Sequence, residues 1–313
     1  MFYPELDKDD SLALHTDLYE INMMYTYFKK GIADRNAVFE VFYRKEPFGN
    51  GYAVYAGLEH VIDYLKNLKF KESDLQYLKE QEDYDDDFID YLRNLKLKLT
   101  IRSMREGELV FANEPILQVE GPLAQCQLVE TAILNIINFQ TLLATKAARI
   151  KLAVQDDSIM EFGSRRAQET DAAIWGTRAA YIGGFDSTSN VRAGKLFNIP
   201  ISGTHAHSLV EAFGSEYEAF KAYAETHKDC VFLVDTYDTV RSGVPNAIKV
   251  ANEMGDKINF LGVRIDSGDM AYISKQVRKE LDDAGYPNAK IFASNDLDEN
   301  TITNLKMQGA KID

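Results

Sequence analysis

The chain has 313 residues, of which 45% are hydrophobic and 27% are charged, a composition typical of a globular protein with enough chain for about two domains. Its formal net charge of −14 argues against nucleic acid or an anionic membrane as a partner, because both bind basic surfaces. No apolar run is long enough for a membrane helix, and residues 1–10 are acidic where a signal peptide would be basic, so a cytoplasmic location is expected.

The first part of the chain is predicted to mix helices and strands. The predicted elements are, in chain order, a helix over 11–30, strands over 37–43 and 52–56, a helix over 58–65, a helix capped by Ser73, a mostly β-like region over 97–120 and one or two helices over 123–154. These elements predict an amino-terminal α+β domain over residues 1–125.

The second part of the chain alternates short apolar runs with amphipathic segments of helical period. The runs cover 158–162, 199–202, 230–234, 258–263 and 290–293, and a helix over 298–308 precedes a further strand that begins at 310–312. This pattern predicts βα units with a parallel sheet, in an irregular α/β barrel domain over residues 126–313. Only about six βα units can be counted, so the carboxyl-terminal part of the barrel is expected to be missing.

Polar side chains follow most of the predicted strands, where barrels and open α/β sheets bind their ligands. They are Arg165, Arg166, Thr204, His207, Asp235, Arg264 and Asp266. Helix capping is the alternative role, and we prefer it for Asp238, Asp269, Ser294, Asn295 and Asp298. Arginine and histidine are poor caps, so we expect the arginines and His207 to meet at one rim of the sheet.

The combination of several motifs, in order over nearly the whole chain, resembles the nicotinate phosphoribosyltransferase family of type II phosphoribosyltransferases. The motifs are Thr16-Asp-Leu-Tyr19, the segment 39–48, Phe162-Gly-Ser-Arg-Arg166, Gly203-Thr-His-Ala-His-Ser208 and Arg264-Ile-Asp-Ser-Gly268. The resemblance implies a homodimeric enzyme of NAD salvage that joins nicotinate to phosphoribosyl pyrophosphate. The products would be nicotinate mononucleotide and pyrophosphate, with Mg²⁺ as cofactor and ATP hydrolysed in a coupled step.

The resemblance also implies roles for individual residues. It makes His207 the site of phosphorylation by ATP, and it places the pyridine ring between Phe162 and the partner chain's Tyr19. The other implied substrate-binding residues are Arg165, which holds phosphate, together with Arg166, Asn190, Thr204 and Arg264. In relatives that use nicotinamide, an aspartate aligns with Asn190, so neutral Asn190 is expected to favour the acid over the amide.

Physical chemistry supports these roles. Neutral imidazole is nucleophilic near neutral pH, which suits His207, and an aromatic sandwich buries both faces of a flat ring. Asp235 and Asp266, the expected catalytic carboxylates, are able to bind ribose hydroxyls, hold Mg²⁺ or stabilise positive charge on a sugar carbon. The ligands of the metal are not identified by the sequence.

The sequence is also compatible with different functions. His205 and His207 have the His-x-His spacing of metal-dependent barrel hydrolases, although few further histidines follow them. Nicotinamide is an alternative substrate, and a relative that only binds ligands is a non-enzymatic alternative. Tyr19 and Phe162, each taken alone, are also compatible with core aromatics.

Overall fold

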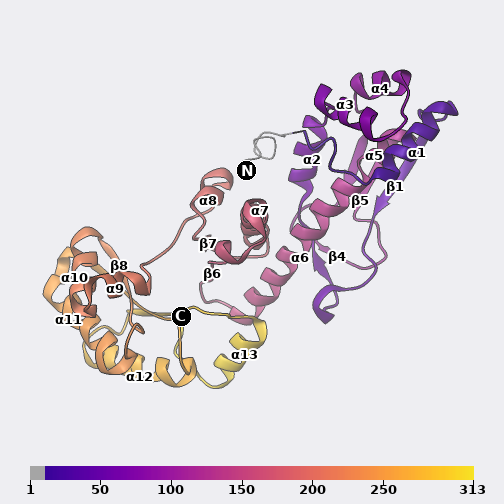
Figure 1. The fold of residues 1–313 in the computed structure, drawn as a ribbon. Coiled ribbons are helices and arrows are strands. Elements are labelled where there is room, and N and C mark those ends of the chain that lie inside the picture. The colour runs from indigo at the N-terminus through magenta and orange to yellow at the C-terminus, as the bar shows by residue number, and fades with distance from the viewer. Residues whose placement is uncertain (1–10) are drawn as a thin grey trace. The chain divides into compact units, whose positions relative to one another are not determined.

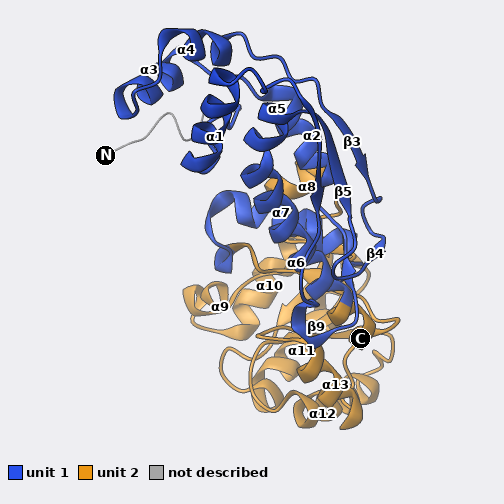
Figure 2. Cartoon of the chain, turned by 90° about the vertical axis from the view of Figure 1, so that its right-hand side faces the viewer, with its two compact units in different colours: residues 1–148, 165–184 blue, residues 149–164, 185–313 orange. Residues whose placement is uncertain are grey.

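The computed structural model describes residues 11–313, which divide into two compact units (Figure 2). Of the described residues, unit 1 contains 11–148 together with Arg165–Gly184, and unit 2 contains Arg149–Ser164 and Phe185–Asp313. Residues 1–10, to which the signal-peptide prediction refers, lie outside the described residues. Within residues 11–313, no helix combines the length and the apolarity needed to cross a bilayer. The cytoplasmic location stays a prediction.

Unit 1 combines a small antiparallel sheet with helices (Figure 1). Its elements are α1 (Leu18–Lys29), β1 (Asn36–Val41), the 3-10 turn η1 (Pro47–Gly49), β2 (Ala53–Val54), α2 (Leu58–Asn67), α3 (Glu72–Gln81), α4 (Asp86–Arg93), β3 (Thr100–Ser103), β4 (Leu109–Val110), β5 (Leu117–Pro122), α5 (Leu123–Leu128), most of α6 (Glu130–Val154) and α7 (Glu169–Ile182). The sheet has the order β1-β5-β3, and β2 pairs separately with β4. The apolar faces of α1 to α6 and of this sheet share one core.

Two helix starts differ from the prediction. Helix α1 is shorter at its amino end, because Leu12 has a positive φ of 50° and the cap Asp17 is extended. Ser73 was expected to cap α3, but it lies inside the first turn of that helix. Lys71 is the cap, and its N–H donates to the Asp74 carboxylate at 2.8 Å.

Helix α7 belongs to unit 1 although it follows part of unit 2 in the chain. The Arg178 guanidinium on α7 donates to Glu106 at 2.7 and 2.9 Å and also to Glu59. Burial alone would raise the pKa of Glu106, but hydrogen bonds from Arg178 and from the Gly57 N–H lower it overall. This largely buried set of ion pairs and hydrogen bonds fixes α7 against the β3–β4 loop and the start of α2.

The predicted domain boundary between residues 125 and 126 does not coincide with the division into compact units. Residues of α5 and α6, among them Leu128 and Ile133, are buried in the same core as α1 and β5. The long helix α6 therefore packs with the amino-terminal layer through most of its length. The division into an α+β domain and a barrel domain stays a prediction.

Unit 2 contains parallel strands connected by helices. Its elements are β6 (Met160–Glu161), the start of the 3-10 turn η2 (Ser164–Arg166), β7 (Ser187–Thr188), α8 (Val191–Phe197), α9 (His207–Phe213), α10 (Glu216–Thr226), β8 (Asp229–Leu233), the π-helical turn η3 (Thr239–Gly243), α11 (Val244–Met254), the 3-10 turn η4 (Gly255–Lys257), β9 (Asn259–Ile265), α12 (Met270–Asp283), β10 (Lys290–Ala293) and α13 (Glu299–Met307). The main sheet has the order β10-β9-β8, and β6 pairs in parallel with β7.

The parallel sheet predicted for the second half is present, but its details differ from the prediction. The run 199–202 contributes only an isolated parallel bridge between Ile201 and Thr188, and β7 was not predicted. Residues 310–312 form no strand, although the Asp313 N–H bonds Ile291 O at 3.0 Å. Within residues 11–313 the parallel strands form separate sheets, so the irregular α/β barrel, incomplete at its carboxyl end, stays a prediction.

The approach of β9 to β10 requires a glycine. Gly262 has φ of +149°, and a Cβ added there would lie 1.9 Å from Lys290 O. Only a residue without a side chain allows this contact. Beyond Gly262 the strand places Val263 and Ile265 in the core of unit 2 and leaves Arg264 on the other face.

Candidate functional site

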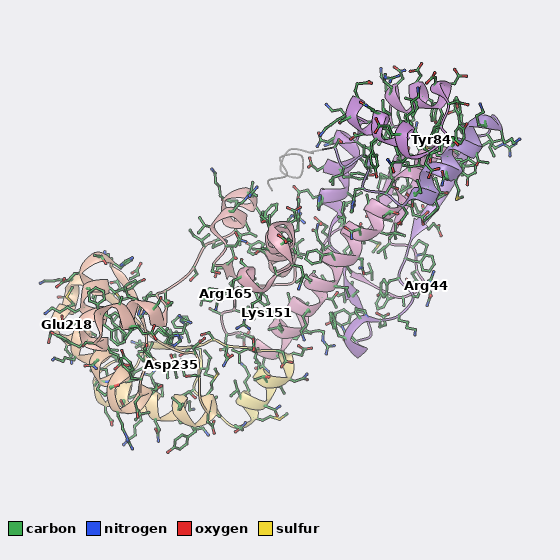
Figure 3. All side chains as sticks on the ribbon, viewed as in Figure 1. Arg44, Tyr84, Lys151, Arg165, Glu218 and Asp235 are labelled. Carbon is green, nitrogen blue, oxygen red and sulfur yellow. The ribbon has the colours of Figure 1, made fainter. Side chains whose placement is uncertain are left out.

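The carboxyl ends of β8, β9 and β10 bring most of the predicted polar residues of unit 2 together. Asp235 follows β8, Arg264 lies near the end of β9, Asp266 directly follows β9, and Ser294 follows β10. Because the three strands are parallel and adjacent, these residues meet at one edge of the sheet. The 203–207 loop lies at the same edge, and Figure 3 labels Asp235 there.

His207 and Asp235 form a hydrogen-bonded pair. Nε2 of His207 lies 3.1 Å from Oδ1 of Asp235, whose side chain is only 2% exposed. The other oxygen of Asp235 accepts from the Asp266 N–H at 3.0 Å and from the Ser267 hydroxyl. A carboxylate that accepts these bonds places the imidazole proton on Nε2, so Nδ1 carries the lone pair. The His207 side chain is 38% exposed, which leaves it accessible to a ligand.

Arg264 connects the 203–207 loop with the end of β10. Its Nε donates to Thr204 Oγ1 at 3.1 Å and its Nη2 to His205 O at 2.7 Å. Its Nη1 donates to Ser294 Oγ at 2.9 Å, and the Ser294 hydroxyl donates to Oδ1 of Asp266. All three guanidinium nitrogens therefore have protein partners, and Arg264 fixes the shape of the rim.

His205 points away from this rim into the core of unit 2. Its ring is 8% exposed and lies 5.1 Å from the Tyr223 ring and 5.7 Å from the Phe220 ring. Nε2 accepts from the Leu233 N–H at 3.2 Å, and Nδ1 lies 3.4 Å from Ala206 O. Both nitrogens are used, so His205 and His207 do not form a metal-binding dyad. The hydrolase alternative fails for this reason.

Acid is expected to destabilise the protein through His205. Burial is the main cause that lowers the pKa of His205 to about 4, whereas an unfolded histidine titrates near about 6.5. Between these two values the unfolded chain binds a proton that the folded chain does not, so the free energy of unfolding falls as the pH decreases. The expected loss from pH 7 to pH 4 is roughly 3 kcal/mol.

Denaturant unfolding of the wild type and of His205→Gln across this pH range measures the effect. The glutamine amide is able to accept from the Leu233 N–H but does not titrate. His227→Gln, at an exposed histidine, is the matched control. Parallel stability curves for the wild type and His205→Gln would contradict the assignment.

Asn190 and Phe162 lie near β6 and β7 in unit 2. Asn190 caps α8, because its Oδ1 accepts from the Ala193 N–H at 3.0 Å. This bond fixes the orientation of the amide, with its oxygen toward α8. Phe162 is only partly buried, and the preceding Glu161 accepts from the Thr188 hydroxyl at 2.7 Å. Phe162 is therefore not a core aromatic.

The remaining predicted residues belong to unit 1. Arg165 and Arg166 are exposed in η2 at the start of Arg165–Gly184, and Figure 3 labels Arg165. Tyr19 is 49% exposed, so it is not a core aromatic either. Its hydroxyl lies 3.3 Å from Glu20 and 3.4 Å from Glu130. Partial burial and the nearby carboxylates raise the pKa of Tyr19 to about 12, so the phenol is neutral at physiological pH.

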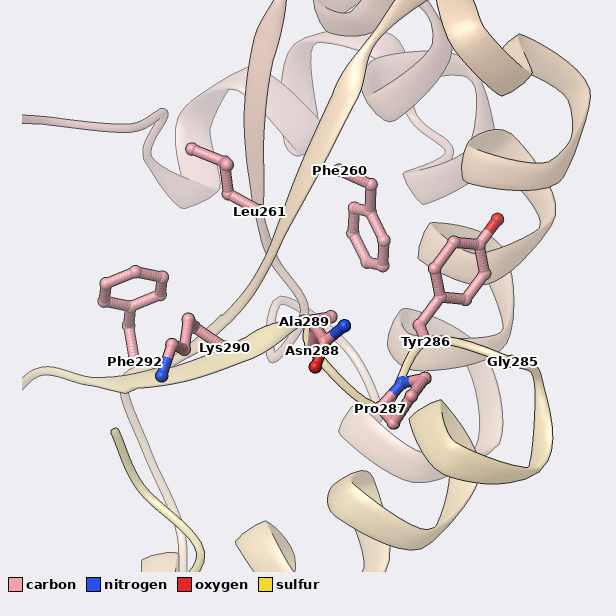
Figure 4. A pocket seen from close by; sticks show the side chains of 9 residues that line it. All are labelled: Phe260, Leu261, Gly285, Tyr286, Pro287, Asn288, Ala289, Lys290 and Phe292. Carbon is pink, nitrogen blue, oxygen red and sulfur yellow. The ribbon is translucent and has the colours of Figure 1, made fainter.

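The site coincides neither with the pocket of unit 2 nor with a ready-made metal-binding cluster. A pocket of about 450 Å³ lies at the amino ends of β9 and β10, lined by Phe260, Tyr286 and Phe292 among others (Figure 4). This is the opposite end of the strands, and the only ionisable side chains in its lining are Lys290 and Tyr286. No group of three or more histidine, cysteine or acidic side chains within residues 11–313 is arranged to hold a metal ion.

Sequence reasoning missed two serines of the site. Ser294 was expected to be a helix cap, but it bonds Arg264 and Asp266, and Ser267 bonds Asp235. The available signal was that Ser294 directly follows a strand parallel to the strand of Arg264. The capping predictions for three aspartates are confirmed, with cap bonds of 2.7 to 3.0 Å for Asp238, Asp269 and Asp298.

Comparisons with known proteins place this geometry in a family. The model of the nicotinate phosphoribosyltransferase (NAPRTase) N-terminal domain matches residues 14–138, and that of the NAPRTase family matches residues 158–309. Nicotinate phosphoribosyltransferase of Bacillus subtilis is 67% identical over 306 residues, which cover 98% of this chain and 62% of that protein. The chain thus spans less than two thirds of the length of this relative.

Solved structures agree with the family models. The crystal structure of human nicotinic acid phosphoribosyltransferase matches with a TM-score of 0.88 and 32% identity, over 95% of this chain and 71% of that one. Nicotinate-nucleotide pyrophosphorylase from Pyrococcus furiosus matches with a TM-score of 0.77 and 26% identity, over 99% of this chain and 75% of that one. The mixed α/β fold is therefore that of type II phosphoribosyltransferases, and the chain belongs to the nicotinate phosphoribosyltransferase family.

Proposed function

We propose that the protein transfers the phosphoribosyl group of phosphoribosyl pyrophosphate to nicotinate, the first step of NAD salvage from nicotinate. The products are nicotinate mononucleotide and pyrophosphate, and ATP hydrolysis is coupled to the transfer. The observation that carries the proposal is the His207–Asp235 pair at the carboxyl edge of the sheet. The names of the Bacillus subtilis and human relatives support the same reaction.

His207 is the proposed acceptor of phosphate from ATP. Nδ1 attacks the γ-phosphorus, a nitrogen–phosphorus bond forms, and ADP leaves with the bridging oxygen. Water later cleaves this bond and releases orthophosphate. Asp235 holds the ring through Nε2 and stabilises the positive charge that the ring acquires during the attack.

The transfer itself requires no general base, because the pyridine nitrogen of nicotinate is unprotonated at neutral pH. The nitrogen attacks C1 of the ribose as pyrophosphate departs, through an oxocarbenium-like carbon. Asp266, whose side chain is 35% exposed, is the carboxylate proposed to stabilise that charge. Arg165, Arg166, Thr204 and Arg264 are proposed to bind the substrates.

The carboxylates at the sheet edge fit a magnesium ion that is held mainly by substrate phosphates. Mg²⁺ is commonly bound by one or two carboxylates together with such phosphates. Asp235 is buried with three donors, so the more exposed Asp266 is the residue that would hold the ion. When bound, Mg²⁺ would neutralise charge on the departing pyrophosphate.

We propose further that the working enzyme is a homodimer with the α/β barrel of the type II fold. The half-exposed Tyr19 of one chain would then stack on the nicotinate that Phe162 of the partner subunit binds.

Mixing inactive Tyr19→Ala and Arg165→Ala subunits is expected to restore part of the activity, because one site of each mixed dimer contains both residues. No recovery after demonstrated subunit exchange would place both residues in the same chain's site.

Asn190 is the residue proposed to determine the preference for nicotinate over nicotinamide. A carboxylate at this position would repel nicotinate, while aspartate caps a helix as well as asparagine does, so α8 is retained. Asn190→Asp is therefore expected to weaken nicotinate use by roughly 2 to 5 kcal/mol in transition-state terms and to shift preference toward nicotinamide. Measurement of kcat/KM for both substrates in the wild type and the variant tests this. If the ratio of kcat/KM for nicotinate to that for nicotinamide is unchanged, Arg264 becomes the residue to examine.

The proposed function is tested with the natural full-length protein, nicotinate, phosphoribosyl pyrophosphate and Mg²⁺, with and without ATP. Nicotinate mononucleotide and pyrophosphate are expected in equal amounts, and ATP is expected to increase their yield. Faster reaction with nicotinamide would favour the amide-specific alternative. Ligand binding without pyrophosphate release would favour the non-enzymatic one.

A further inference from the structure

Two serine hydroxyls each bond one of the two aspartates of the site. The Ser267 hydroxyl donates to Oδ2 of Asp235, and the Ser294 hydroxyl donates to Oδ1 of Asp266. Neither serine was among the predicted site residues. They come from different segments, since Ser267 follows β9 and Ser294 follows β10.

The two aspartates differ in what else they contact. Oδ1 of Asp235 accepts from His207, while Oδ2 accepts from Ser267. The Ser267 contact therefore fixes the rotation of the carboxylate that orients the imidazole. Asp266 shares Ser294 with Arg264, whose Nη1 donates to the serine oxygen at 2.9 Å. Nη1 of Arg264 lies 3.7 Å from Oδ1 of Asp266, so the serine bridges the two side chains at this separation. Ser267 thus supports the aspartate that orients His207, and Ser294 connects the other aspartate with Arg264.

We propose that Ser267 and Ser294 are positioning residues for separate halves of the coupled reaction, an inference that rests on the proposed function. Ser267 holds Asp235 for phosphoryl transfer from ATP to His207. Ser294 holds Asp266 and Arg264 for phosphoribosyl transfer to nicotinate. A hydrogen bond to a charged group contributes enough free energy that the loss of either hydroxyl corresponds to a roughly 10- to 100-fold change in rate.

The backbone connects the two halves. The Asp266 N–H donates to the same Asp235 oxygen that accepts from Ser267, at 3.0 Å. From Asp266 the bonds continue through Ser294 and Arg264 to His205 O, two residues before His207. These contacts form a closed circuit that includes Ser294, whereas Ser267 bonds only Asp235 from outside it. Each serine variant is therefore expected to change both rates, but most strongly the rate that depends on the aspartate it bonds directly.

The test compares two rates in Ser267→Ala and Ser294→Ala of the natural full-length protein. The first is the labelling of His207 by γ-³²P-ATP without nicotinate or phosphoribosyl pyrophosphate. The second is the formation of nicotinate mononucleotide without ATP. Ser267→Ala is expected to reduce labelling at least tenfold more than transfer, and Ser294→Ala to reduce transfer at least tenfold more than labelling.

Matched variants separate positioning from a loss of structure. Ser267→Thr and Ser294→Thr retain the hydroxyl and are expected to recover most of the affected rate. Ser274→Ala removes a buried serine of α12 that lies outside the site. Its hydroxyl donates to Ala271 O and accepts from the Lys311 N–H, and the variant is expected to leave both rates near wild type.

The outcomes distinguish this inference from the proposed function. If the wild type performs both reactions but each alanine variant reduces the two rates by the same factor, or by none, the inference is wrong and the proposed function stands. If the wild type performs neither reaction, the proposed function fails and the inference fails with it.

Discussion

His207→Ala is expected to abolish phosphorylation of the protein by ATP and the stimulation of transfer by ATP. The side chain provides the only nitrogen nucleophile of the described residues that is both paired with Asp235 and exposed at the rim. His205 cannot replace it, because it is buried and its ring nitrogens have backbone partners, the Leu233 N–H and Ala206 O. Incubation with γ-³²P-ATP, followed by acid and base treatment, measures acid-labile and base-stable label.

His205→Gln is the matched control for this prediction. It is expected to retain the label, because the glutamine keeps an acceptor for the Leu233 N–H while His207 is unchanged. Label on His207→Ala protein at wild-type level would assign the phosphate to another residue. Transfer without ATP is expected to persist in His207→Ala, since the pyridine nitrogen attacks without a base.

Asp235→Asn is expected to lower the rate of His207 phosphorylation by roughly 10³- to 10⁴-fold, the loss seen when an orienting aspartate of a catalytic triad becomes asparagine. An amide cannot accept from the Asp266 N–H, the Ser267 hydroxyl and His207 Nε2 at once with the same strength. If its NH₂ faces His207, the imidazole proton moves to Nδ1 and the nucleophilic lone pair is lost.

Single-turnover labelling measures this effect, and the pH dependence of labelling adds a second measurement. Asp238→Asn, which replaces a capping aspartate in the next turn, is the control and is expected to label at the wild-type rate. A wild-type labelling rate in Asp235→Asn would show that the buried carboxylate has only a structural role.

The sequence predicted the parallel strands but not the arrangement of the sheets. Strands β8, β9 and β10 were recognisable because Val231, Val263 and Ile291 belong to short apolar runs too brief for helices. Strand β7 was missed, since Ser187 and Thr188 are polar and pair over only two residues. Short pairings of this kind depend on tertiary contacts, which local periodicity does not encode.

The site residues were predictable where a reactive side chain directly follows a predicted strand. His207 and Asp235 were selected from motif and strand end, and the structure brings them to 3.1 Å. His205 was not separable from His207 by spacing, because its direction is decided by the aromatic cluster around Phe220. Ser294 was assigned to capping, since its partner Arg264 lies 30 residues away in the chain.

The division of the chain has a consequence for recombination between relatives. The backbone passes from one unit to the other after Ala148, after Ser164 and after Gly184, and the first passage lies inside the continuous helix α6. No single cut or crossover point therefore separates the two units. A chimera that exchanges one unit between relatives has to match three junctions, and a protease that cleaves once leaves α7 attached to sequence of unit 2.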